Sequence, residues 1–344
     1  MPQPPLPPLK FKPRFVSRLW GGQALTAFGK ALPPDDTIGE SWEVYDFPPG
    51  VVDEGWTSAT VAGGAYDGKT LHDLMADDAM RSELLGTAKA VPTPHGPQFP
   101  LLVKFLDARQ DLSVQVHPTQ TYADTHPEAH LKNEAWFVLS HDDGARLLVG
   151  LKPDVTREQF EAALAGDREA IESVLEQVPA EDGKVHYLPS GTVHALGAGI
   201  VVAEVQTPSD TTFRVHDFGR VDPKTGESRQ LHVKQAMDVI QFGDDSVPPP
   251  EPKATANAEF DEMVVDAPQF ETTHRLLKAG NGAPLPGTRC SVIVMIEGRG
   301  TIMVDEADDV TIGRGEVVVL PSTLEGPILE ADEDCRWLET TFPA

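Results

Sequence analysis

Residues 112–140 read LSVQVHPTQTYADTHPEAHLKNEAWFVLS and contain two strand-like apolar stretches separated by a polar interruption. The first stretch carries Gln115 and His117, and residues two apart in a strand lie on the same face. Burying both side chains without partners would cost on the order of several kcal/mol. The pattern therefore predicts that either a metal ion or a hydrogen-bond network receives them.

A second motif, LPSGTVHAL at residues 188–196, places Pro189, Gly191 and His194 in the spacing P-x-G-x-x-H. The glycine suits a tight turn that directs the histidine inward. Together the two segments offer an amide oxygen, two imidazoles and a carboxylate, from Gln115, His117, Glu134 and His194. This set suits Zn²⁺, and Fe²⁺ or Mn²⁺ would accept similar ligands. We therefore predict one metal ion per chain.

The composition limits the partners that we expect. The chain has 344 residues and a formal net charge of −26, from 54 acidic and 28 basic residues. This charge argues against nucleic acid and anionic membranes as partners. No stretch approaches the roughly 18 apolar residues that a membrane-spanning helix needs, and residues 1–13 lack the apolar core of a secretory signal. The isolated Cys290 and Cys335 suggest reduced thiols, so we expect a cytoplasmic protein.

Short strand-like stretches dominate the chain and predict a mainly β protein. They are bounded by Gly, Pro and Asp, which favours a sandwich or a barrel. Apolar residues at helical spacing interrupt them at 70–86, at about 154–178 and at 231–242. Thr156 followed by Gln159 is a capping box that predicts the start of one helix.

A proline-rich segment divides the chain into two expected domains. Residues 244–257 (DDSVPPPEPKATAN) show no apolar periodicity and predict a linker. We expect a metal-binding domain over residues 1–245 and a smaller β domain over residues 258–344. The second domain lacks the P-x-G-x-x-H signature after Pro321, and His274 is its only histidine. We therefore expect it to bind no metal and to support the first domain by packing.

Four segments, LSVQVHP, KNEAWFVL, PSGTVHAL and SDTTFRVHDFGR, occur in an order that resembles the type I phosphomannose isomerase family of the cupin superfamily. SRLWGG (17–22), IGESWEV (38–44) and FPLLVKFLDARQDLSVQVHP (99–118) agree with this resemblance, which covers about the first 245 residues and weakens beyond them. It implies a double cupin, with two β-barrel or jelly-roll halves and short helical insertions. It also implies a zinc-dependent aldose–ketose isomerase that interconverts mannose 6-phosphate and fructose 6-phosphate by proton transfer between C1 and C2, through a cis-enediol intermediate.

The resemblance implies roles for individual residues. The metal ligands of the family correspond to Gln115, His117, Glu134 and His194, and its basic active-site residues correspond to Lys104, Lys132 and Arg214. We rank Arg214 as the electrostatic stabiliser, because its guanidinium can bind phosphate or an enediolate. Lys132 lies two residues before Glu134, and if both residues are in strand geometry they face the same cavity, which suits a base or a phosphate contact. Thr119 and Gln120 depart from the acidic residues that the family often has after His-Pro.

Three further residues are predicted to bind substrate, each against a simpler structural alternative. Lys104 is an unusual charge within PLLVKFL, and its alternative role is a lysine that extends its amine to solvent at an edge strand. Trp20 could wall the sugar pocket or pack in the core. Ser41 could donate a hydrogen bond to the phosphate. The polar loop at residues 119–131 is long enough to form a lid.

Two other classes of function remain open from the sequence. Another metal cupin enzyme, such as an Fe²⁺ dioxygenase, would share the histidines but would not require cations for a substrate. A non-enzymatic sugar-binding cupin would not need to keep Lys132 and Arg214. The expected partner is a small sugar phosphate, and the chain is expected to be a monomer or a homodimer.

Overall fold

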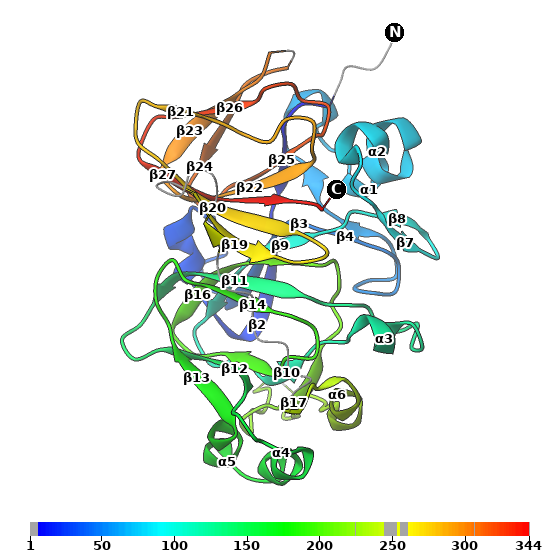
Figure 1. Ribbon diagram of the computed structural model, residues 1–344, viewed down its shortest axis with the longest axis vertical. Coiled ribbons are helices and arrows are strands. Elements are labelled where there is room, and N and C mark those ends of the chain that lie inside the picture. Colours follow the sequence, from blue (N-terminus) through cyan, green and yellow to red (C-terminus); the bar gives the residue numbers. More distant parts are fainter. Residues whose placement is uncertain (1–5, 224, 244–252, 255–260, 306, 344) are drawn as a thin grey trace.

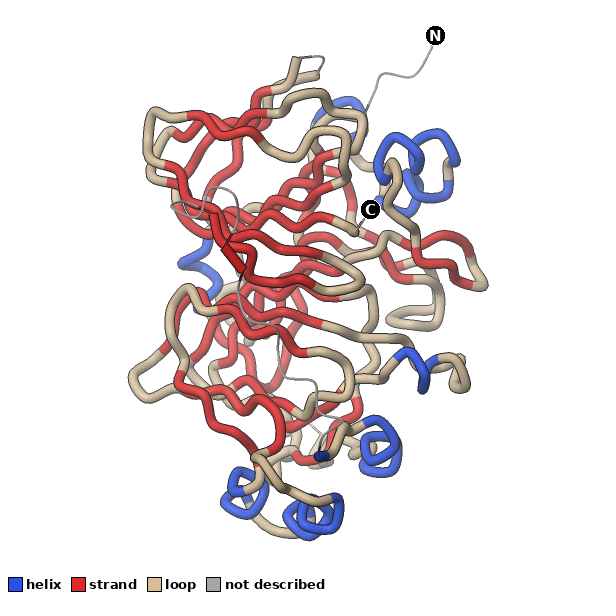
Figure 2. The backbone as a smooth tube through the Cα atoms, viewed as in Figure 1, coloured by secondary structure: helices blue, strands red, loops and turns tan. Residues whose placement is uncertain are grey.

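The computed structural model describes residues 6–223, 225–243, 253–254, 261–305 and 307–343. Most of the predicted linker at 244–257 lies outside these residues. The prediction of a mainly β protein with short helical insertions is confirmed, since strands form most of the ordered elements (Figure 2). Among the described residues, no helix is long and apolar enough to cross a membrane.

Two antiparallel sheets form the half of the molecule that holds the predicted site. The six-stranded sheet has the order β14-β11-β16-β9-β3-β2, and the five-stranded sheet has the order β13-β12-β15-β10-β17. Their bounds are β2 (Arg14–Gly22), β3 (Ile38–Val44), β9 (Leu102–Ala108), β10 (Val114–Val116), β11 (Glu134–His141), β12 (Arg146–Leu151), β13 (Leu175–Pro179), β14 (Val185–Leu188), β15 (His194–Leu196), β16 (Ile200–Gln206) and β17 (Phe213–His216). Apolar side chains from both sheets, including Leu106, Val138, Leu147 and Leu196, form a shared core.

Two more sheets form the other half. The eight-stranded sheet has the order β18-β19-β20-β27-β22-β25-β1-β6, and the four-stranded sheet has the order β21-β26-β23-β24. Their bounds are β1 (Leu9–Lys12), β6 (Thr60–Val61), β18 (Lys253–Ala254), β19 (Asp261–Asp266), β20 (Glu271–Leu277), β21 (Gly282–Pro284), β22 (Ser291–Glu297), β23 (Arg299–Met303), β24 (Val310–Gly313), β25 (Val317–Leu320), β26 (Ile328–Ala331) and β27 (Cys335–Thr341). Ile293, Ile302, Val318 and Trp337 lie in the core between these sheets.

The two halves pack through their largest sheets, which lie next to each other along the long axis of the molecule (Figure 1). Phe105 and Phe137 of the six-stranded sheet join Val292 and Leu338 of the eight-stranded sheet in one buried core. Strand β1 comes from the N-terminal region, yet it pairs with β25 of the C-terminal region. Hydrogen bonds therefore join the parts of the chain on either side of the predicted boundary, and the division at 245 and 258 stays a prediction.

The helices are short and lie outside the sheets (Figure 1). They are α1 (Leu71–Ala76), α2 (Asp78–Leu85), α3 (Gln120–Ala123), α4 (Arg157–Leu164), α5 (Arg168–Ser173) and α6 (Val233–Val239), with two 3-10 turns, η1 (Ala24–Phe28) and η2 (Gly64–Tyr66). Two small hairpins pair β4 (Asp46–Phe47) with β5 (Thr57–Ser58) and β7 (Val91–Thr93) with β8 (Gly96–Gln98).

The helix predictions are confirmed at some ends and wrong at others. The Thr156–Gln159 capping box is present and starts α4. The stretch 70–86 forms two helices instead of one, because extended Asp77 ends α1 and its side chain accepts hydrogen bonds from the first amides of α2. Helix was also predicted as far as residue 178, which is wrong, because Leu175–Pro179 is strand β13 and pairs with β12.

Candidate active site

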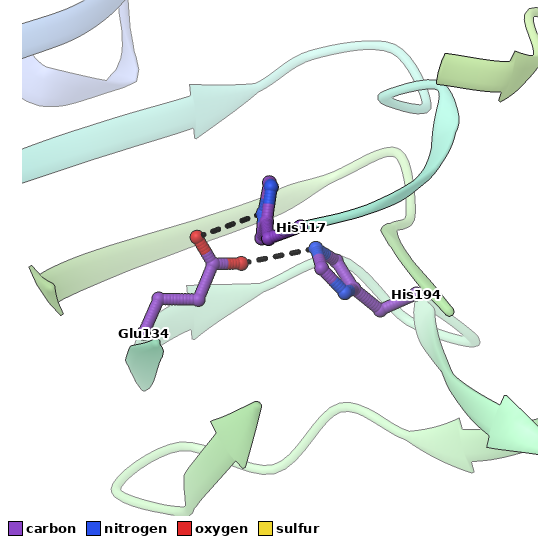
Figure 3. Close-up of side chains that lie close together, drawn as sticks. All are labelled: His117, Glu134 and His194. Atoms are coloured by element: carbon purple, nitrogen blue, oxygen red, sulfur yellow. Dashed lines mark ion pairs between the residues drawn. The ribbon is translucent and has the colours of Figure 1, made fainter. Parts of the chain in front are cut away.

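Three predicted metal ligands meet at the buried ends of strands in the first half. His117 follows β10, Glu134 begins β11 and His194 begins β15. The Glu134 carboxylate lies between the two imidazoles, with its oxygens 3.3 Å from His117 Nε2 and 3.0 Å from His194 Nε2 (Figure 3). Each of the three residues is only 1% exposed. Their candidate ligand atoms all lie within 4.8 Å of one another, so one ion could contact all three residues.

The hydrogen bonds around this cluster fit a divalent cation. His117 Nδ1 lies 3.1 Å from the carbonyl oxygen of Thr211, and His194 Nδ1 lies 2.9 Å from that of Thr192. If each Nδ1 donates a proton there, each Nε2 keeps its lone pair for a metal. His117 Nε2, His194 Nε2 and Glu134 Oε1 are buried and make no hydrogen bond within the described residues. Nitrogen and oxygen lone pairs therefore converge on one point without a protein donor, as a metal site requires.

The electrostatics keep His117 and Glu134 in the protonation states that bind metal. Burial, followed by the charge of Lys132, lowers the pKa of His117 to about 3, so its imidazole is neutral near pH 7. Burial opposes ionisation of Glu134, but Lys132, His117 and His194 outweigh it and lower the pKa of its carboxyl. A neutral imidazole beside an ionised carboxylate is what a divalent ion needs.

Gln115, the fourth predicted ligand, lies next to this cluster. It pairs with His194 across β10 and β15 and with Arg214 across β10 and β17. Its side chain lines the same cavity as Glu134. Its role as a ligand stays a prediction.

A cavity of about 490 Å³ opens beside the cluster. The predicted site residues that line it are Trp20, Lys104, Gln115, Lys132, Glu134 and Arg214. A larger cavity, of about 640 Å³, lies between Tyr66 and Asp308, but none of its described lining residues is a histidine or a cysteine. The chemistry therefore points to the smaller cavity.

Six charged side chains of alternating sign form a row beside this cavity, five of them on neighbouring strands and the sixth, Lys132, just before β11. The strands are β2, β3, β9, β16 and β11, which are successive neighbours in the six-stranded sheet. The row runs Arg18, Glu40, Lys104, Glu204, Lys132, Glu134, and its successive N···O distances are 2.5, 3.6, 3.2, 3.9 and 2.8 Å. We call this row the charge row. It neutralises Lys104 and Lys132 locally, so these lysines are paired with carboxylates instead of being free cations.

Glu40 and Glu204 hold the charge row in place. Trp42 Nε1 donates to Glu40 at 2.7 Å, and Trp136 Nε1 donates to Glu204 at 3.1 Å. Burial opposes ionisation of Glu40, but the charges of Lys104 and Arg18 and the hydrogen bonds from Trp42 and Arg18 lower its pKa to about 2. Burial and then the nearby carboxylates raise the pKa of Glu204, although Lys104 works against this.

Sequence reasoning missed these roles of Arg18, Glu40 and Glu204. A single carboxylate within the buried stretch GIVVAEVQT was the available signal for Glu204, because charged residues are rarely fully buried unless they are paired.

Arg214, on β17, differs from the lysines because it has no carboxylate partner among the ion pairs of the described residues. Its Nε donates to Ser113 Oγ at 3.2 Å, and its Nη1 donates to the Gln230 carbonyl at 3.0 Å. Burial, followed by repulsion from Arg229 and other arginines, lowers its pKa. Arg214 therefore presents to the cavity a guanidinium that forms no ion pair with a described carboxylate, although Asp217 is near enough to raise its pKa against these effects.

The structure places the two remaining predicted substrate contacts differently. Trp20 is 4% exposed and both lines the cavity and packs in the core, so its two proposed roles are compatible. Ser41 pairs with Phe105, which faces the core between the halves. Its hydroxyl donates to Glu43 at 2.5 Å, and it is not among the lining residues of the cavity. We therefore leave Ser41 out of the substrate site that we propose.

The predicted loop at 119–131 begins with the short helix α3 and ends in a tethered segment. Tyr122 stacks on His126 with ring centroids 3.9 Å apart. The amide of His130 donates to Thr211 Oγ1, and Thr207 Oγ1 donates to the Leu131 carbonyl. The end of the loop nearest Lys132 is thus fixed to the segment after β16.

Comparisons with known proteins agree with this geometry. Residues 9–141 match the model of the phosphomannose isomerase type I catalytic domain. The mannose-6-phosphate isomerase of Streptococcus mutans is 33% identical over 326 residues, which cover 94% of this chain and 96% of that protein. A probable mannose-6-phosphate isomerase of Bacillus subtilis is 41% identical over 257 residues, which cover 74% of this chain and 75% of that protein.

A solved structure also matches over nearly the full length. The crystal structure of mannose 6-phosphate isomerase from Bacillus subtilis has a TM-score of 0.81 at 27% identity, and the match covers 97% of this chain and 99% of that chain. This match confirms the predicted double-cupin fold.

Proposed function

The chain belongs to the type I phosphomannose isomerase family, whose members are isomerases, and on that premise we propose that it interconverts mannose 6-phosphate and fructose 6-phosphate. The observation that carries this proposal is the buried cluster of His117, Glu134 and His194 at the edge of a cavity lined by an arginine, Arg214, that forms no ion pair with a described carboxylate. Such a cavity suits a negatively charged sugar that must react beside a metal ion.

We propose that Gln115, His117, Glu134 and His194 hold one zinc ion. A bound divalent ion supplies Lewis-acid stabilisation of negative charge on the sugar oxygens. The mixed nitrogen and oxygen donor set, with three buried atoms that lack hydrogen bonds, supports a resident metal. Zinc is favoured because two imidazoles and a carboxylate match its usual ligands.

The remaining chemistry falls to the basic residues of the cavity. Isomerisation moves a proton between C1 and C2 of the open-chain sugar through a cis-enediol, so a positioned group must take the proton and return it. We propose Lys132 for this transfer, because its Nζ lies 2.8 Å from Glu134 at the metal end of the cavity. The ammonium form of Lys132 would be disfavoured beside a metal ion held by Glu134, which leaves its amine able to take the proton and return it. We propose that Lys104 orients sugar hydroxyls from the middle of the charge row.

Arg214 is proposed to stabilise the negative charge that develops during proton transfer. Its guanidinium is fixed by Ser113 and Gln230 before substrate arrives, and preorganised charge of this kind is an effective form of transition-state stabilisation.

The proposal is tested with an enzyme-linked assay of mannose 6-phosphate conversion, together with a measurement of oxygen consumption. Formation of fructose 6-phosphate that depends on a bound metal supports it. Oxygen consumption without isomerisation would instead indicate a cupin dioxygenase, and saturable sugar binding without turnover would indicate a binding protein.

A further inference from the structure

Arg18 lies at the outer end of the charge row, away from the metal ligands. Its side chain is 35% exposed, compared with 9% for Lys104 and 1% for Glu134. The charge row therefore runs from the solvent-exposed side of the cavity to its buried metal end. A substrate that reacts at the metal end would have its far end near Arg18.

The structure fixes Arg18 while leaving its donors available. Its Nε makes an ion pair with Glu40 at 2.5 Å, and its backbone amide donates to the Thr37 carbonyl. Within the described part of the chain, no hydrogen bond is made by Nη1 or Nη2. Since Arg18 lines the cavity, two N–H-bearing nitrogens on a held guanidinium are available to a ligand there.

Gly39 makes room for this arrangement. A Cβ atom at Gly39 would lie 2.6 Å from Arg18 Cβ, 2.7 Å from Arg18 Cγ and 2.7 Å from a ring carbon of Trp20. Real Cβ atoms do not approach other atoms so closely, so any larger residue would displace Arg18 or Trp20. The motifs SRLWGG and IGESWEV thus supply both the arginine and the glycine and glutamate that position it.

Arg18 and Arg214 line the same cavity, and each has fewer carboxylate ion-pair partners than Lys104 and Lys132, which have two each. Arg18 has one carboxylate partner, which it shares with Lys104, and Arg214 has none among the described residues. The charge of Arg18 is also among those that lower the pKa of Arg214, after burial and after Arg229 and Arg220. Two arginines that repel each other across a cavity favour a ligand with multiple negative charges between them.

We propose that Arg18 is a further substrate-binding residue that anchors the phosphate group of the sugar, with Glu40 as the residue that positions it. This inference rests on the proposed function and deepens it. The phosphate lies on C6, at the opposite end of the sugar from C1 and C2, so it reaches toward the outer end of the charge row when those carbons lie at the metal. The planar fork of Arg18 suits phosphate oxygens better than a single ammonium would.

The test compares Arg18→Gln with wild type in two assays, isomerisation of mannose 6-phosphate and its competitive inhibition by inorganic phosphate. We expect Arg18→Gln to raise both the KM and the inhibition constant of phosphate about tenfold, which is the loss expected for one charge-assisted contact. We expect kcat to change less than about threefold, because this contact is equally strong before and during the reaction. Arg18→Lys keeps the charge but loses the fork, so it should fall between wild type and Arg18→Gln.

Arg14→Gln is the matched control, because Arg14 lies on the same strand but pairs with Asp53 and does not line the cavity. Arg14→Gln should leave the KM and the inhibition constant of phosphate unchanged, whereas Gly39→Ala should raise both by displacing Arg18.

If the wild type is active and Arg18→Gln has the same KM and the same inhibition constant of phosphate, the role of Arg18 is wrong but the proposed function stands. An equal effect of Arg14→Gln would also overturn the role of Arg18, since the loss would then reflect overall charge. A folded wild type that does not isomerise mannose 6-phosphate would instead refute the proposed function. If Arg18→Gln does not fold, Arg18→Lys decides between these outcomes.

Discussion

Replacing Arg214 with glutamine removes the cavity's guanidinium that lacks a carboxylate partner while keeping a polar side chain of similar reach. The lysines of the charge row are each paired with carboxylates, so they give the cavity little net charge. Removing one preorganised group that stabilises charge in the transition state typically costs about 2.7–4 kcal/mol, or roughly 10²–10³-fold in kcat. We therefore expect Arg214→Gln to lower kcat by about that factor and to retain its metal, because Arg214 is not among the proposed ligands.

The assay measures kcat and KM with mannose 6-phosphate, and the metal content of the same samples is determined by mass spectrometry. Arg146→Gln is a suitable control, because Arg146 lies in the same five-stranded sheet but pairs with Glu172 at 44% side-chain exposure. Near-normal turnover by Arg214→Gln would refute the electrostatic role. Loss of the metal together with activity would show that Arg214 acts on the metal site instead.

Three other predictions concern the metal, the charge of the cavity and the packing between the halves. Removing the metal with a chelator should lower Tm by several degrees, since an ion present at 100 times its Kd contributes about 2.7 kcal/mol; an unchanged Tm in differential scanning fluorimetry would contradict a resident ion. The KM for mannose 6-phosphate should rise with ionic strength, because salt screens the attraction of the phosphate to Arg18 and to the more distant charge of Arg214; a flat salt dependence would count against this phosphate site. Burial and then Arg336 lower the pKa of His274 to about 4 from 6.5, so the unfolded chain takes up this proton first and stability should fall as the pH drops from about 6.5 to 4. After allowance for partial exposure, the free energy of unfolding measured with denaturant should fall by about 2 kcal/mol more in the wild type than in His274→Gln over this pH range. Equal pH dependence of the two proteins would refute the effect.

The meeting of His117, Glu134 and His194 could be predicted, because local sequence carries part of its geometry. Strand alternation puts Gln115 and His117 on one face, and Gly191, with φ of +86°, forms the turn before His194. The same alternation argues against Ser41, because neighbouring residues of a strand face opposite sides and Glu40 faces the cavity.

The charge row could not be predicted, because it depends on which strands become neighbours. Glu40, Lys104 and Glu204 come from distant parts of the chain and meet only through the order β3-β9-β16. Local periodicity does not encode that order. The error at Leu175–Pro179 has a similar cause, because a short apolar stretch fits helix or strand and its pairing with β12 decides between them.

The proposed function depends on one ion, held by His117, Glu134 and His194, that the reaction requires. The most direct test is elemental analysis of the purified wild type and of Glu134→Gln, which keeps the shape of the side chain but removes its charge. We expect about one zinc per chain in the wild type, and loss of most of the zinc and nearly all activity in a folded Glu134→Gln. A wild type that isomerises mannose 6-phosphate without a bound divalent metal, or a Glu134→Gln variant with full zinc and full activity, would contradict this expectation.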